Sequence, residues 1–201
     1  MGVPCQERHS WHHHLFLITQ GFLQVPGIDY FDIFAPVVKL ASICTVLAIA
    51  AADDLEMHQI NIKGTYLNDI LTSCKVVYMQ QPPGYHNPSQ PKLICHLQKT
   101  LYGLKQSGCC WYQRLVEIMM THLKFLRSDI DQAVFFCHNE KSVIIVLVHI
   151  DNCTITASLM ALITDFQITK HIEITNLGEL HWLLGIEVKR NYEHRTIHLS
   201  Q

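Results

Sequence analysis

The pattern of apolar and polar residues predicts two adjacent strands in the last third of the chain. A run of β-branched and apolar residues at 143–148 is followed by a polar tetrapeptide at 149–152 and a second short apolar segment at 153–156. Branched side chains favour a pleated strand, whereas Asp and Asn accept turn geometry. We therefore expect a hairpin with Asp151 and Asn152 at its tip. An ordinary hairpin closed by an Asx turn is the simpler interpretation of this window when it is taken alone.

The remaining periodicities predict helices alternating with short strands. Ser42 is a candidate cap for a helix through Ala52, and a Pro-Gly turn follows a strand end near residues 21–25. The order of elements from residue 106 onward predicts an α+β sheet with helices on one face. The expected helices are 42–52, 106–123 and 157–170, and the further expected strands are 57–66, 93–97, 133–137, 184–189 and 196–199.

Composition favours a folded intracellular protein. Hydrophobic residues make up 49% of the 201 residues and charged ones 16%, which suits a packed core of one domain or two small lobes. The longest apolar run, 46–52, is too short to span a membrane, and the first residues lack the pattern of a signal peptide. We therefore expect a cytoplasmic or nuclear protein without a membrane segment, poorly ordered over residues 1–20.

Cysteine and histidine are frequent but irregularly spaced. None of the eight cysteines forms a C-x-x-C pair, so we expect free thiols in a reducing compartment. The tract 12–14 is three histidines without supporting ligands. A metal- or thiol-based protein is therefore kept only as an alternative. The formal charge of −2 argues mildly against tight nucleic-acid binding, because phosphate neutralisation supplies most of that affinity.

Seven sequence blocks occur in an order typical of one protein family. They resemble the reverse transcriptase domain encoded by copia-type LTR retrotransposons, and the resemblance covers about residues 21–201. The blocks are Gly21-Phe22-x-Gln24-x-x-Gly27-Ile28-Asp29-Tyr30 with Phe34-Ala35-Pro36; Gln59-x-x-x-Lys63 with Tyr66-Leu67-Asn68; residues 78–85; residues 101–106; the turn at 149–152; residues 177–180; and residues 183–188.

The resemblance implies a polymerase right hand. Its palm would be an antiparallel sheet backed by helices, at about 58–75 and 106–190. Its fingers would lie at about 21–57 and 76–105, and its thumb would be largely missing. The rest of the retrotransposon polyprotein, including protease, integrase and ribonuclease H, is expected to be absent from this chain.

The resemblance also implies a catalytic centre that this chain lacks in part. Such enzymes use two Mg²⁺ ions about 3.5–4 Å apart, held by three carboxylates. The corresponding positions here are Asn61, Asp151 and Asn152, with His149 where the family has tyrosine. One carboxylate of three remains, and Asp151 is the expected metal ligand. We predict that polymerase activity is lost or severely impaired.

Cations that the family uses for triphosphate contact are also replaced. Gln20 stands where lysine is common, and Cys44 where arginine is usual. The pair Cys109-Cys110 stands where at least one arginine is expected. These departures weaken phosphate binding.

Other family features are retained. Tyr66 would exclude ribonucleotides beneath the sugar, although a core tyrosine is the simpler interpretation. Gly103 would allow a close approach of nucleotide and template, or would only permit a turn. Lys63 and Lys105 would contact phosphate, or would only be solvated lysines. The turn made by Gly185, Ile186 and Glu187 would grip the primer end, or would be a plain strand bend.

Two functions are left open for a member of this family. The first is a degraded reverse transcriptase domain whose partners are an RNA/DNA primer–template and deoxynucleoside triphosphates. The alternative is a non-catalytic remnant that binds nucleic acid.

Overall fold

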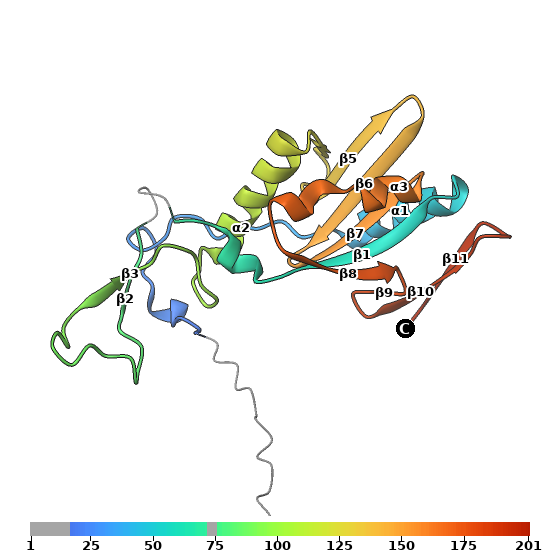
Figure 1. Ribbon diagram of the computed structural model, residues 1–201. Coiled ribbons are helices and arrows are strands. Elements are labelled where there is room, and N and C mark those ends of the chain that lie inside the picture. Colours follow the sequence, from blue (N-terminus) through green and yellow to red (C-terminus); the bar gives the residue numbers. More distant parts are fainter. Residues whose placement is uncertain (1–16, 72–75) are drawn as a thin grey trace, which may run out of the picture.

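A six-stranded antiparallel sheet forms the centre of the computed structural model, which describes residues 17–71 and 76–201 (Figure 1). Every neighbouring pair in this sheet is antiparallel. Together with the helices, it confirms the predicted α+β class. From one edge to the other the strands are β4 (Leu126–Arg127), β5 (Val134–Asn139), β6 (Ser142–His149), β7 (Asn152–Ala157), β1 (Glu56–Ile62) and β8 (Ile174–Glu179).

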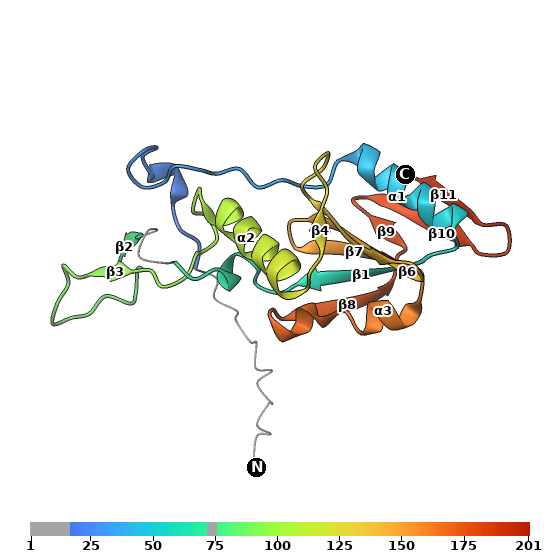
Figure 2. The same cartoon turned by 90° about the horizontal axis from the view of Figure 1, so that it is seen from above.

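Helices cover both faces of this sheet. Figure 2 shows α1 (Leu40–Ala52) and α3 (Met160–Thr164) on opposite sides of it, and α2 (Ser107–Val116) near one end. Residues 146–148 and 153–157 are all buried, which a strand covered on one face only would not show. The expectation of helices on one face was therefore wrong. Within the described parts of the chain, no helix combines the length and apolar character needed to cross a bilayer.

Two smaller sheets complete the described structure. The strands β9 (Trp182–Leu183), β10 (Ile186–Asn191) and β11 (Thr196–Ser200) form one sheet in the order β11-β10-β9. The strands β2 (Tyr78–Gln80) and β3 (Ile94–His96) form the other, far to the left of the six-stranded sheet in both Figure 1 and Figure 2.

Most predicted elements are present, with shifted ends. The helix predicted at 106–123 is confirmed, its last part being the π-helical segment η3 (Glu117–His122). The strand predicted at 57–66 stops at Ile62, because Gly64 adopts a left-handed conformation before the 3₁₀ turn η2 (Thr65–Asn68). The strands predicted at 93–97, 133–137 and 196–199 and the hairpin at 143–156 are confirmed. The strands β2, β4, β8 and β9 were not predicted.

Two further element predictions were wrong, and one predicted strand begins two residues late. The single helix at 157–170 is instead the short α3 and the 3₁₀ turn η4 (Gln167–Lys170), separated by an extended Phe166. That ring is buried and packs edge-on against Phe125, so the core interrupts the helix. The strand predicted at 184–189 is present as β10, which begins at Ile186 because residues 184–185 form a turn after β9. The strand end near 21–25 is the 3₁₀ turn η1 (Gly21–Leu23). Residues 1–16 of the predicted poorly ordered segment lie outside the described residues.

A distant aspartate caps α1 in place of the predicted Ser42. The helix begins at Leu40, and the Asp131 carboxylate accepts hydrogen bonds from the Lys39 amide (2.9 Å) and the Ser42 hydroxyl (2.6 Å). Burial alone would raise the pKa of Asp131. The hydrogen bonds from Ser42, Lys39 and Ala133 outweigh burial and hold that pKa below its ordinary value. The Ser42 hydroxyl thus donates a hydrogen bond to the capping carboxylate of Asp131 and does not itself cap the helix.

Two buried threonines give a matched test of hydrogen bonding in the core. The Thr156 hydroxyl lacks an acceptor among the described residues, whereas the buried Thr65 hydroxyl donates to the Ile62 carbonyl at 3.1 Å. We expect Thr156→Val to raise the free energy of unfolding by about 1 kcal/mol, because an unpaired buried hydroxyl is removed without loss of volume. Thr65→Val should lower it by a similar amount. Urea denaturation measures both; destabilisation by Thr156→Val would contradict the assignment.

Candidate active site

A tight turn presents Asp151 at the end of the β6–β7 hairpin. His149 pairs with Asn152, which leaves Ile150 and Asp151 as the two turn residues. Ile150 has φ of +59°, as the first central residue of a type II′ hairpin turn does. This conformation is unfavourable for a β-branched residue. The buried indole of Trp111 supports the turn by donating a hydrogen bond to the Ile150 carbonyl at 3.1 Å.

The structure brings Asn61, Asp151 and Asn152 together. Asn61, near the end of β1, lies directly opposite Asn152 on β7, so the two side chains share one face of the sheet. The next amide, that of Ile62, donates a hydrogen bond of 2.7 Å to the Asp151 carbonyl. Three residues from two distant segments therefore surround one turn.

Gln59 also belongs to this group, although the sequence analysis did not single it out. It is buried, and its side-chain amide donates a 2.7 Å hydrogen bond to the side-chain oxygen of Asn152. Its position two residues before Asn61 places both on the same face of β1. The spacing of two residues between Gln59 and Asn61 was the sequence signal that could have identified Gln59 as a neighbour of the site. Trp111 lies within the helix predicted at 106–123, and its contact with the turn had no signal in the sequence.

The donor set at this turn does not fit a pair of divalent cations. Asp151 supplies one carboxylate, and the side-chain oxygen of Asn152 already accepts a hydrogen bond from Gln59. Asn61 and Asn152 carry no charge, whereas Mg²⁺ prefers anionic oxygen. Within 17–71 and 76–201, no group of three or more His, Cys, Asp and Glu side chains is arranged to hold a metal ion.

Tyr66 lies close to the turn, at the start of the segment that follows β1. Its ring meets that of Tyr102 edge-to-face, with 4.9 Å between centroids, and its carbonyl accepts a hydrogen bond from the Thr100 hydroxyl. Burial raises the pKa of Tyr66, and the neighbouring Tyr102 and Asp151 raise it further. The ring also lines a hollow of about 30 Å³ beside Trp111 and Ile150. Tyr66 is thus half-buried at the edge of the site, not in the core.

Gly103 meets the backbone of another retained block. A Cβ atom on Gly103 would lie 2.1 Å from the Thr19 carbonyl oxygen, and one on Gly21 would lie 1.9 Å from the Gly103 oxygen. The Thr19 amide donates a hydrogen bond to the Tyr102 carbonyl at 2.8 Å. Two glycine-containing blocks therefore pack backbone to backbone, which explains both glycines without any ligand.

The two candidate phosphate-binding lysines differ in their surroundings. Lys63 forms an exposed ion pair with Glu173 at 2.6 Å, and its amide donates to the Glu173 carbonyl. Lys105 is exposed, and its backbone amide donates to the side chain of Gln24 at 2.8 Å. Because Lys63 follows Asn61 by two residues, its charge lies beside the turn of Asp151. The ion pair with Glu173 holds it there.

Gly185, Ile186 and Glu187 belong to the three-stranded sheet and not to the turn that carries Asp151. Leu184 and Gly185 both have positive φ and connect β9 to β10. Hydrogen bonds from Lys189 and Ser200 lower the pKa of the partly buried Glu187 carboxyl. Leu180, just before β9, donates its amide to the Met57 carbonyl. At the rise of a strand, Met57 lies roughly 13 Å from Asn61 along β1.

Comparisons with known proteins identify one family of similar sequences. The family model described as reverse transcriptase (RNA-dependent DNA polymerase) matches residues 6–201. The retrovirus-related Pol polyprotein from transposon RE1 of Arabidopsis thaliana is 36% identical over 187 residues, covering 92% of this chain and 12% of that protein. The corresponding polyprotein from transposon TNT 1-94 of Nicotiana tabacum is 35% identical over 188 residues, covering 92% and 14%. The chain thus spans a small part of each relative. No solved structure gives a significant match.

Proposed function

Because this chain belongs to the reverse transcriptase (RNA-dependent DNA polymerase) family, we propose that it is a reverse transcriptase domain whose catalytic centre has lost the ability to bind its metal ions. The resemblance to copia-type retrotransposon proteins is confirmed by the relatives from transposons RE1 and TNT 1-94. One observation carries the proposal: Asn61 lies opposite Asn152 and beside Asp151, at the three positions where the family places carboxylates.

The size of the electrostatic deficit favours loss of activity. Two unit charges 4 Å apart interact by roughly 4 kcal/mol at an effective dielectric constant near 20, and by about twice that when one ion is divalent. Losing even half of this at the transition state slows a reaction on the order of a thousandfold. Because two of three carboxylates are replaced by amides, we assign this chain no metal-dependent step.

We assign the six-stranded sheet to the palm of a right hand. The palm would include about 58–75 and 106–190, with the hairpin of Asp151 at its catalytic edge. The fingers would include about 21–57 and 76–105. The position of β2 and β3, away from the six-stranded sheet, supports a separate role for the second of these segments. The helix α1 would then be the part of the fingers segment that packs against the palm.

The alternative is a non-catalytic domain that still binds nucleic acid. Lys63, Lys105 and Tyr66 would supply its contacts to phosphate and sugar. Retention of an RNA–DNA hybrid over a series of salt concentrations, beside primer extension with Mg²⁺ or Mn²⁺, separates the possibilities. Binding without extension is the expected result of a binding remnant, and its salt slope counts the phosphates contacted. Extension at a normal rate would overturn the proposed loss of catalysis.

Glu173 offers a test of the role proposed for Lys63. We expect Glu173→Gln to tighten hybrid binding about two- to fivefold. The exposed ion pair competes with phosphate for the lysine, and breaking such a pair costs a free energy that corresponds to this factor. The control is Glu117→Gln, which frees Arg114 from a 2.6 Å ion pair between α2 and η3 and changes the net charge equally. Equal effects of both variants would show that only net charge matters. Fluorescence anisotropy at low salt measures both.

A further inference from the structure

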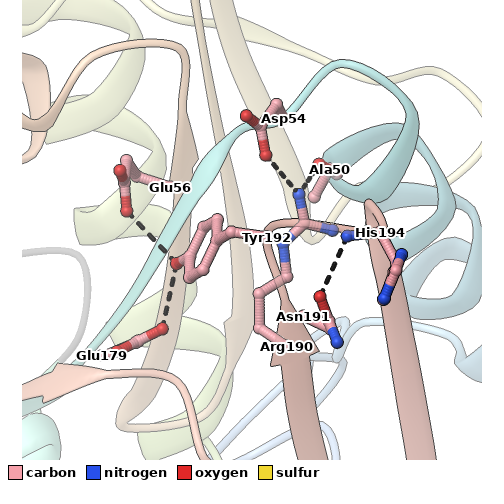
Figure 3. Close-up of polar contacts among 8 residues, drawn as sticks. All are labelled: Ala50, Asp54, Glu56, Glu179, Arg190, Asn191, Tyr192 and His194. Atoms are coloured by element: carbon pink, nitrogen blue, oxygen red, sulfur yellow. Dashed lines mark hydrogen bonds and ion pairs between the residues drawn. The ribbon is translucent and has the colours of Figure 1, made fainter.

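A polar cluster lies at the start of β1, where the three-stranded sheet contacts α1, β1 and β8 (Figure 3). The strands of that sheet are not hydrogen-bonded in register with the six-stranded sheet. Buried apolar side chains join the two sheets, among them Leu180, Leu183 and Val188. Apolar contacts are non-directional and fix orientation poorly. One directional contact is the hydrogen bond from the Leu180 amide to the Met57 carbonyl, and others come from the polar side chains of β10 and the turn after it.

Arg190 connects β10 to the end of α1. Its side chain is only 2% exposed, and one terminal nitrogen donates to the Ala50 carbonyl (3.1 Å) and to the Asp54 carboxylate (2.8 Å). A cation at the last carbonyls of a helix completes their hydrogen bonding and interacts favourably with the helix dipole. The other two guanidinium nitrogens are buried and find no acceptor in the described structure. A displaced Arg190 would leave a buried charge without its partner.

Tyr192 connects the same sheet to β1 and β8. Its hydroxyl lies 3.3 Å from a carboxylate oxygen of Glu56 and 2.9 Å from one of Glu179. The guanidinium of Arg190 stands 4.9 Å from the centre of the Tyr192 ring. Figure 3 shows the Tyr192 hydroxyl between the two carboxylates, with Arg190 beside the ring. Burial, followed by the hydrogen bond to Glu179 and the charge of Glu56, raises the pKa of Tyr192, so the hydroxyl stays protonated.

We infer that Arg190 and Tyr192 are positioning residues, which fix the turn at Gly185–Glu187 relative to Asn61 and Asp151. β10 carries the turn at one end and the cluster at the other, whereas β1 carries the cluster at its start and Asn61 near its end. Because each strand is a short rigid element, the contacts at the cluster set the distance between Asn61 and the turn at Gly185–Glu187. This inference rests on the proposed function, since the turn matters only as a primer grip.

Tyr192→Phe is the central test, because it removes the hydroxyl and keeps the ring. In hydrogen exchange under native conditions, amides of residues 182–191 should exchange about tenfold faster, as expected from loss of one hydrogen bond to a charged group. Amides of β6 and β7 should be unchanged. The control is Tyr85→Phe, at an exposed ring. Equal acceleration in β6 and β7, or none in 182–191, would overturn the inference. Glu179→Gln, which keeps an oxygen acceptor for the Tyr192 hydroxyl, provides a milder variant should Tyr192→Phe fail to fold.

A binding measurement distinguishes a positioning role from a purely structural one. Tyr192→Phe should weaken hybrid binding by about three- to tenfold without changing the salt slope, because no phosphate contact is removed. In a chain already carrying Ile186→Ala, the same change should have little further effect. Additive effects would contradict positioning through the turn. Absence of hybrid binding by the unaltered chain would refute the binding role, and the exchange result would still decide whether the cluster holds the sheet.

Discussion

Replacing Asn61 and Asn152 together by aspartate is expected to raise primer extension at least about a thousandfold above the unaltered chain. The two substitutions restore the carboxylates that Mg²⁺ prefers, at positions already opposed across β1 and β7. Gln59 would then donate its hydrogen bond to a carboxylate at position 152 and hold it in the same orientation. Incorporation of labelled nucleotide on an RNA template, measured with Mg²⁺ and with Mn²⁺, gives the rate.

Two further variants control for charge. Asn87→Asp and Asn139→Asp together add the same charge outside the turn, Asn139 lying at the opposite end of β6 from Asp151. Both side-chain oxygens accept backbone hydrogen bonds that aspartate keeps. This pair should leave the chain inactive. Each single reversion at the turn should recover less than the double reversion, since two ions require more than two carboxylates. If the double reversion remains inactive, the lost carboxylates are not sufficient to explain inactivity. The positions of Gln20 and Cys44, where the family has cations, would then be the next candidates.

Gly103→Ala is expected to lower the free energy of unfolding by about 2–4 kcal/mol. The added methyl would lie 2.1 Å from the Thr19 carbonyl oxygen, so the backbone must move, and the residue has φ of +96°. For a chain of this size the midpoint of thermal unfolding should fall by about 5–15 °C. Differential scanning calorimetry measures the change.

Gly84→Ala is the matched control for this prediction. Gly84 has φ of +82°, but its added Cβ would meet nothing within 4 Å. We expect a cost of about 1 kcal/mol, from backbone conformation alone. The difference between the variants therefore measures the close approach of the two blocks. Equal destabilisation would mean that Gly103 is needed for its conformation only and that its contact with Thr19 contributes nothing.

Local sequence patterns sufficed to predict the elements near the site. The β-branched run before His149 and the polar residues after it predict the hairpin, because strand and turn preferences are local. The family resemblance then predicted which residue of the earlier strand belongs beside Asp151. Neither source identified Gln59 as a partner of Asn152, because the hydrogen bond depends on the register between β1 and β7.

Contacts between distant segments account for the predictions that failed. The break at Phe166 follows from burial of its ring against Phe125, which helix propensity cannot report. Asp131 caps a helix that lies some ninety residues earlier, so the nearby Ser42 was the only visible candidate. The Arg190–Tyr192 cluster joins α1, β1, β8 and β10, and no short motif marks it.

Titration with Mn²⁺, followed by electron paramagnetic resonance, tests the central claim most directly. The unaltered chain and the Asn61→Asp, Asn152→Asp chain are compared at equal concentration, with nucleoside triphosphate omitted so that only protein ligands contribute. We predict that the reverted chain retains Mn²⁺ at concentrations where the unaltered chain retains none. Equal retention by both chains would contradict the claim that the loss of two carboxylates has emptied this site of its metal-binding capacity.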